Sequence, residues 1–137
     1  MTDSHLFRLA REASFQSDYS GNAHIGAIVV YKGCVLAKGS NSDKTHTVQA
    51  RYNKWRYKNG GNRYLPDKAH AELAALSKVK YLDIDWAKVH VYVYRELRDG
   101  SLAAARPCEA CMAAIRRMGI HHIHYTTSDG FCHEKLL

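Results

Sequence analysis

The residues best suited to chemistry in this 137-residue chain form two short motifs. His70 lies two residues before Glu72, and Cys108 lies three residues before Cys111, directly after Pro107. Residues three apart share one face of a helix, so the two thiols can grip one ion together. A helix start at this point also favours thiolate over thiol, because the N-terminal end of the helix dipole is positive. The two motifs together predict a metal centre.

One imidazole and two thiolates make three protein ligands, which is the number typical of a catalytic zinc site. A structural zinc site is normally closed by four protein ligands, whereas a catalytic site keeps one position for water and lowers the pKa of that water toward ~7. Glu72 points to a different side of a regular helix from His70, so its carboxylate is suited to carry a proton. We expect Glu72 to be the catalytic residue. The expected ligands of one Zn²⁺ per chain are His70, Cys108 and Cys111.

Redox chemistry is the main alternative for the cysteine pair. A Cys-x-x-Cys at a helix start can also form a reactive dithiol, with His70 an ordinary helix residue. This interpretation leaves the His-x-Glu motif without a role. The other two cysteines, Cys34 and Cys132, stand alone, which is not the pattern of a small secreted disulfide framework. We therefore expect a reducing compartment.

Length and hydropathy bound the class of protein. The chain is long enough for a single domain over residues 1–137 with one sizeable core. No apolar run approaches the roughly 20 residues of a membrane span. The first residues, Met1 to Arg11, lack the long apolar stretch of a secretory signal. A cytoplasmic protein without a membrane partner is expected.

Apolar periodicity predicts the elements that must position the two motifs. In chain order they are a helix over residues 6–13, a hairpin over 25–38, a helix from Pro66-Asp67 to Val79, a strand over 89–94, a helix from Pro107 to about Met118 and a strand over 120–126. This order indicates an α/β fold with a mixed sheet covered by helices.

The two motifs resemble the signature of the cytidine deaminase superfamily, H-x-E followed by P-C-x-x-C. Residues 25–30 and 38–41 are similar to the first hairpin of that family and the Gly-x-Asn that ends it. Residues 107–125 are similar to its ligand helix and following strand. The resemblance implies a three-layer cytidine deaminase-like fold, with a mixed central sheet flanked by helices. With a histidine as its first ligand, the motif resembles that of the deoxycytidylate, tRNA-adenosine, guanine and polynucleotide deaminases.

The resemblance also implies an activity, the hydrolytic removal of an amino group from a nucleobase. Activated water attacks C4 of cytosine or C6 of adenine. Glu72 takes the water proton, delivers a proton to the ring nitrogen and assists ammonia departure. Further substrate contacts implied by the resemblance are the Asn41 side chain, the Ala71 backbone N–H and the Arg106 carbonyl. The alternative for Asn41 is a turn residue after Gly39.

A basic and aromatic segment, from Asn41 to Lys68, precedes the first motif. Seven basic residues stand against two acidic ones there, which favours phosphate-bearing partners, although a solvated basic face has the same composition. We expect a long functional loop, with a short helix around residues 47–57. Candidate phosphate or base contacts are Arg51, Trp55, Arg56, Lys58 and Arg63.

These features predict a zinc-dependent deaminase that converts cytosine to uracil in a phosphate-bearing substrate such as a (deoxy)cytidine nucleotide. One alternative is deamination of cytosine or adenine in single-stranded DNA or RNA, whose bases would stack on the aromatic residues of the basic segment. Another is a zinc-stabilised nucleic-acid-binding module without catalysis, although such a module has no need of Glu72. A homo-oligomer is compatible with each of the three.

Three departures from the family are visible. The segment before the first motif holds His46 and no cysteine, so no second zinc is expected there. An extra loop, Arg95 to Arg106, is expected to line the mouth of the site. Only seven residues follow Gly130, so the last strand and helix of larger members are expected to be truncated or absent.

Histidines are also concentrated near the end of the chain, at positions 121, 122, 124 and 133. On a strand His122 and His124 share a face. With Cys132 they could form another metal site, but the sequence alone assigns no metal to them.

Overall fold

A computed structural model describes residues 2–44, 46–58 and 68–136 of the chain, with the backbone alone over 54–58. In chain order the elements are α1 (Asp3–Ser14), β1 (Ala23–Tyr31), β2 (Cys34–Ser40), α2 (Thr47–Lys58), α3 (Ala71–Ser77), a 3₁₀ turn (Trp86–Lys88), β3 (Val89–Leu97), α4 (Glu109–Arg117), β4 (His122–Thr127) and β5 (Gly130–Lys135). No helix in the described ranges has the length and apolar character needed to cross a bilayer.

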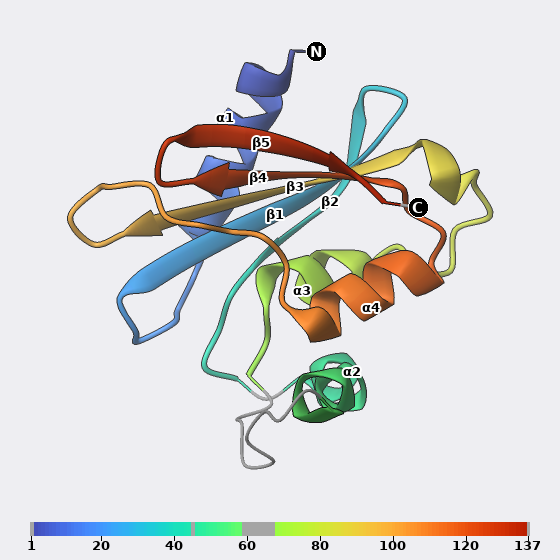
Figure 1. Ribbon diagram of the computed structural model, residues 1–137, viewed down its shortest axis with the longest axis horizontal. Coiled ribbons are helices and arrows are strands. Elements are labelled where there is room, and N and C mark those ends of the chain that lie inside the picture. The colour runs from blue at the N-terminus through green and yellow to red at the C-terminus, as the bar shows by residue number, and fades with distance from the viewer. Residues whose placement is uncertain (1, 45, 59–67, 137) are drawn as a thin grey trace.

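The five strands form one sheet in the order β2-β1-β3-β4-β5. Only β3 and β4 run parallel, and the other neighbouring pairs are antiparallel. Figure 1 shows α1 on one face of this sheet and α2, α3 and α4 on the other. The expected three-layer α/β fold with a mixed central sheet is confirmed.

Alternating residues of the central strands build the two cores, because successive side chains of a strand point to opposite faces. On one face Phe7 and Ala10 of α1 pack with Ile28 and Tyr92. On the other face the helices that carry the two motifs pack against residues such as Val91 and Val93. The sheet thus holds the motifs on the face opposite to α1.

Glycines let the helices approach the sheet closely at two points. A Cβ at Gly26 would collide with the Ala10 carbonyl and the Ser14 amide of α1. A Cβ at Gly39 of β2 would lie 2.5 Å from the carbonyl oxygen of Ala71, the first residue of α3. The second approach fixes the start of α3, and with it the first motif, directly against the sheet.

The expected hairpin, the first helix and the short helix within the basic segment are all present. The turn between β1 and β2 has positive φ at both Lys32 (49°) and Gly33 (79°), as a type I′ turn requires. Figure 1 also shows how α2 lies beneath α3 and α4, away from the sheet. The basic segment therefore contributes a helix, α2, which lies on the side of α3 and α4 that faces away from the sheet.

Both motif-bearing helices begin later than the sequence predicted. Residues 66 and 67 lie outside the described part of the chain, and α3 begins at Ala71. Ala69 is extended instead, because its N–H donates to the Lys44 carbonyl and its carbonyl accepts from the Ser42 N–H. Likewise α4 begins at Glu109 instead of Pro107, since a ψ of 170° keeps the preceding residue outside the helix as its N-cap.

The last strand, which was expected to be truncated or absent, is present. Residues 130–135 form β5, which pairs antiparallel with β4, Tyr125 lying opposite Cys132. Six residues suffice because the turn at Gly130, with φ of 138°, returns the chain directly along β4.

Candidate active site

A cleft of about 380 Å³ opens at the N-terminal ends of α3 and α4. Its lining includes five of the residues that the sequence singled out, together with one arginine that the sequence analysis assigned only to a loop. The lining residues used below are Asn41, His70, Glu72, Arg95, Arg106 and Cys108. The structure thus gathers residues from four separate parts of the chain around one cavity.

The three expected metal ligands meet at the floor of this cleft. His70 is the N-cap of α3, Cys108 is the N-cap of α4 and Cys111 lies in the first turn of α4. The Nδ1 atom of His70 lies 3.4 Å from the Sγ atom of each cysteine. All three ligand atoms lie within 4.8 Å of one another.

This donor set fits zinc. With Zn–N of about 2.0–2.1 Å and Zn–S of about 2.3 Å, a tetrahedral centre places the nitrogen about 3.6 Å from each sulfur. The observed 3.4 Å separations come close to that edge length. Soft thiolates with imidazole are ligands that zinc accepts readily, whereas magnesium and calcium prefer oxygen.

The two thiols differ in their readiness to ionise. The Cys111 thiol, hydrogen-bonded to the sulfur of Cys108, lowers the pKa of Cys108 to about 4, and His70 acts in the same direction. The pKa of Cys111 is raised, because the same hydrogen bond and complete burial both favour its protonated form. Cys108 is therefore the residue of the pair that carries the thiolate when the two share one proton.

Glu72 lies in the first turn of α3, on the same floor of the cleft as the three ligands. Its side chain is only 5% exposed, and this burial raises the pKa of the carboxyl group. The group of three candidate metal ligands does not include Glu72. Its carboxyl group is therefore able to exchange protons with a molecule in the cleft.

Two buried polar residues of α2 support the position of His70, and no pattern in the sequence marked them. The Gln49 side-chain oxygen accepts from the His70 backbone N–H at 3.2 Å, and Gln49 Nε2 donates to Asn53 Oδ1 at 2.9 Å. Both side chains are fully buried. The basic segment therefore has an inner face that fixes the position of His70.

Asn41 lines the cleft, but its amide is already used within the fold. Its Oδ1 accepts from the Ile25 N–H at 2.9 Å and from the Ser17 hydroxyl at 2.6 Å. Its Nδ2 donates to the Ala23 carbonyl at 3.0 Å. Only the second N–H of Nδ2 remains for a substrate, so the substrate contact stays a prediction and the structural role is the observed one.

We expect Asn41→Ala to lower the free energy of unfolding by about 1–3 kcal/mol, because it leaves the buried Ile25 N–H and Ala23 carbonyl unpaired. Urea unfolding measures this loss. Asn22→Ala, at an exposed position directly before β1, is the control and should change stability little. Unchanged stability with a raised Michaelis constant would instead make Asn41 chiefly a substrate contact.

The two predicted backbone contacts flank the metal ligands. Ala71 is the first residue of α3, so its N–H has no acceptor within the helix. Arg106 lines the cleft beside Cys108, and its guanidinium forms two hydrogen bonds of 3.0 Å with Glu134 of β5. This pairing links the segment before α4 to β5.

Most of the predicted phosphate or base contacts cannot be placed. Arg51 is exposed on α2. The side chains of Trp55, Arg56 and Lys58, and the whole of Arg63, lie outside the described residues. Their role as a nucleic-acid surface stays a prediction.

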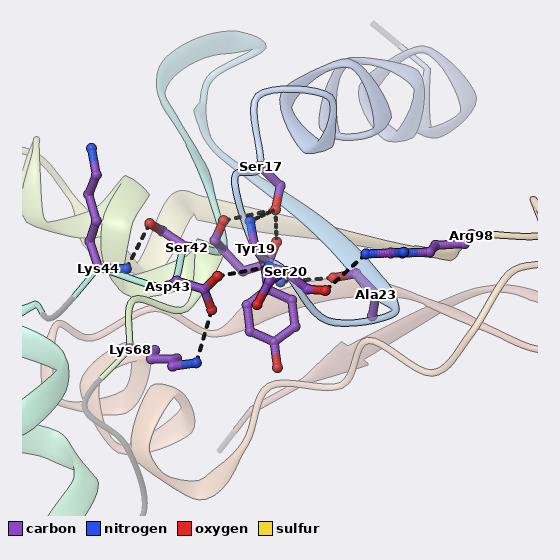
Figure 2. Close-up of polar contacts among 10 residues, drawn as sticks. Ser17, Tyr19, Ser20, Ala23, Ser42, Asp43, Lys44, Lys68 and Arg98 are labelled. Carbon is purple, nitrogen blue, oxygen red and sulfur yellow. Dashed lines mark hydrogen bonds and ion pairs between the residues drawn. The ribbon is translucent and has the colours of Figure 1, made fainter.

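Figure 2 shows the polar network at one rim of the cleft, where the chain around Ser20 meets the end of the hairpin. Asp43 accepts from the Ser20 N–H and from the Lys68 ammonium, both at 2.9 Å. The Lys68 ammonium also lies 5.6 Å from the centre of the Tyr19 ring. The hydrogen bond to Asp43 raises the pKa of Lys68, so this cation is charged but already matched by a carboxylate.

Arg95 differs from the other two cations of the cleft. Lys68 is paired with Asp43 and Arg106 with Glu134. Arg95 Nη1 donates to the Ala104 carbonyl at 3.2 Å, and no carboxylate pairs with Arg95 among the residues that the structure describes. Arg95 belongs to β3 and not to the expected loop over residues 95–106, because β3 continues to Leu97 in pairing with β1. The end of β3 thus brings one positive charge without a carboxylate partner to the cleft.

Comparison with known families shows to which family the chain belongs. The family model of the cytidine and deoxycytidylate deaminase zinc-binding region matches residues 1–127. Among curated proteins, none matches the chain. The matched range includes both motifs and every lining residue named above.

Solved structures of low sequence identity share the fold. Cytidine deaminase from Burkholderia pseudomallei aligns over 98% of this chain and 93% of its own, with 18% identity and a TM-score of 0.65. The dCMP deaminase from the cyanophage S-TIM5 aligns over 93% and 86%, with 21% identity and a TM-score of 0.59. Guanine deaminase from Bacillus subtilis aligns over 93% and 65%, with 19% identity and a TM-score of 0.57.

Proposed function

Because the chain belongs to the cytidine and deoxycytidylate deaminase zinc-binding family, and is thus a zinc-dependent deaminase, we propose that its substrate is a cytosine nucleotide. The reaction is the conversion of cytosine to uracil with release of ammonia. The observation that carries the proposal is one cleft at which three candidate zinc ligands, a buried carboxyl group and a guanidinium without a carboxylate partner meet.

In this proposal His70, Cys108 and Cys111 hold the metal. Zinc bound there supplies an acidified water as nucleophile at neutral pH. The three side chains come from two helix starts that pack against the same sheet, so their positions are fixed before any substrate enters. Gln49 holds the backbone of His70 from the far side.

Glu72 moves the protons. A C–O bond forms at C4 as water attacks, and Glu72 accepts the proton that the water gives up. It then passes that proton to N3 of the ring. Glu72 next takes the proton of the new C4 hydroxyl group and delivers it to the amino group, so that the C4 carbonyl forms as the C–N bond breaks and ammonia leaves. Burial of Glu72 favours this role, because few water molecules compete with the substrate for its carboxyl group.

Arg95 is the proposed contact for the phosphate. A cation without a carboxylate partner, at the rim of a cleft, attracts an anionic substrate. A guanidinium can also form two parallel hydrogen bonds with phosphate oxygens. Lys68 is a weaker candidate, since Asp43 already neutralises it.

The test compares cytidine, cytidine monophosphate with its deoxy form, and a short cytosine oligonucleotide at one salt concentration. We expect the highest kcat/KM on a mononucleotide. Arg95→Gln should raise the Michaelis constant for the mononucleotide at least tenfold and leave that for the nucleoside nearly unchanged. Arg117→Gln, on the exposed face of α4, serves as the matched control and should change neither.

Two results would contradict this proposal. Equal efficiency on all three substrates would remove the phosphate from recognition and leave the basic segment as a solvated face. Highest efficiency on the oligonucleotide, falling steeply with salt, would favour the single-strand alternative and the basic segment. Residues other than Arg95 would then bind the phosphate.

A further inference from the structure

Four histidines gather on the sheet face opposite to the cleft. His90 comes from β3, His122 and His124 from β4, and His133 from β5. The strand register places His90 beside His122 and His124 beside His133. Figure 1 shows these three strands side by side with α1 behind them. The cluster is therefore assembled by pairing of three strands.

Several ring nitrogens of this cluster lie close together, and the His124 and His133 rings stack nearly parallel with their centres 4.2 Å apart. The exposed His133 ring must therefore turn for its lone pair to meet an ion shared with His124. His90 Nδ1 lies 2.8 Å from His124 Nε2, and His122 Nδ1 lies 3.1 Å from His133 Nε2. One ring nitrogen each of His90, His124 and His133 lies within 4.8 Å of the other two. Three nitrogens bound tetrahedrally to one zinc ion stand about 3.3 Å apart, so the observed spacing brackets the required value.

A carboxylate lies near the most buried of these rings. His124 is 3% exposed, and its Nδ1 has no hydrogen-bond partner among the described residues. The nearest acidic atom is Oδ2 of Asp3, at 3.8 Å, while Oδ1 of the same residue accepts from the Tyr92 hydroxyl at 2.6 Å. A carboxylate on one ring nitrogen is the usual companion of a metal on the other.

We propose that His90, His124 and His133 bind a divalent transition-metal ion of the zinc class at a second site, on the face opposite to the catalytic cleft. Imidazole nitrogens suit zinc, copper and nickel, and the exposed His133 leaves the ion open to solvent on one side. Such an ion joins β3, β4 and β5, and through Asp3 it also fixes the start of α1.

Equilibrium dialysis of the zinc-loaded protein against micromolar zinc at pH 7.5 tests this site. We expect two zinc ions per chain in the parent protein and one in His133→Gln. His90→Gln should also bind one. His121→Gln is the matched control, because His121 is exposed directly before β4 and outside the cluster. This variant should bind two zinc ions per chain.

Histidine ring NMR gives a second readout that does not depend on catalysis. The second equivalent of zinc should shift the ring signals of His90, His124 and His133 and leave those of His5 and His121 in place. Cys108→Ser should keep these shifts, which separates this site from the catalytic one. One zinc per chain in the parent protein, or a second zinc retained in both His90→Gln and His133→Gln, would overturn the proposal.

Discussion

Glu72→Ala is expected to lower kcat by about 10²–10⁴-fold or more while zinc content and fold are kept. The size of the effect follows from the number of proton transfers that one carboxyl group serves, since both nucleophile formation and ammonia departure need it. Glu72 lies beside the three ligand atoms without being one of them, so its removal leaves the metal donors intact. Ammonia release and elemental analysis for zinc measure the two quantities.

Glu72→Gln sharpens this prediction, because the amide keeps the shape of the buried side chain but cannot carry a proton between atoms. It should lose activity to a similar degree. Glu12→Gln, on the exposed surface of α1, is the control and should behave like the parent protein. A loss of zinc in Glu72→Ala comparable to the loss in a cysteine variant would make Glu72 a ligand.

Cys108→Ser and Cys111→Ser are expected to lose most of the zinc from the cleft, and with it activity and stability. An ion present at 100 times its dissociation constant stabilises the fold by about 2.7 kcal/mol, and that contribution disappears with the ion. Cys111 is fully buried, so a serine hydroxyl at this position also loses part of its hydration. Zinc analysis with thermal unfolding, each with and without added zinc, measures both effects.

Cys34→Ser is the matched control for these two variants. Cys34 is an exposed thiol at the start of β2, on the hairpin turn. It should keep zinc, activity and melting temperature. Full zinc occupancy in either Cys108→Ser or Cys111→Ser would refute the ligand assignment.

Local patterns were enough to predict the parts of the site that lie close together in the chain. Cys108 and Cys111 are three residues apart, and the spacing alone placed both thiols at one helix start. The type and number of ligands predicted the pairing of this motif with His70, the resemblance to a family supported it, and the 3.4 Å separations in the structure agree with it. The central sheet followed from alternating apolar runs.

Contacts between distant parts of the chain were not predictable in this way. Gln49 and Asn53 are buried polar residues in a segment without hydrophobic periodicity, so nothing in the sequence marked their inner face. His90 precedes His124 by 34 residues, and only the register of β3 on β4 brings their rings to 2.8 Å. Strand register is a tertiary property that residue spacing does not encode.

Helix starts show the same limit on a smaller scale. The apolar spacing of α3 gave its buried face, yet the first residues of the expected helix are extended because Ala69 pairs with the chain at Lys44 and Ser42. This pairing places His70 at the N-cap, where its side chain faces the thiols of α4. The departure from the simple helix pattern is therefore what builds the site.

The most direct test of the account is ammonia release by the zinc-loaded protein from cytosine, adenine and guanine compounds, each supplied as base, nucleoside, nucleotide and oligonucleotide. We predict stoichiometric conversion of a cytosine nucleotide to the uracil nucleotide and ammonia, and loss of that conversion in Glu72→Ala. No ammonia from any of these compounds, with zinc bound at His70, Cys108 and Cys111, would contradict the account.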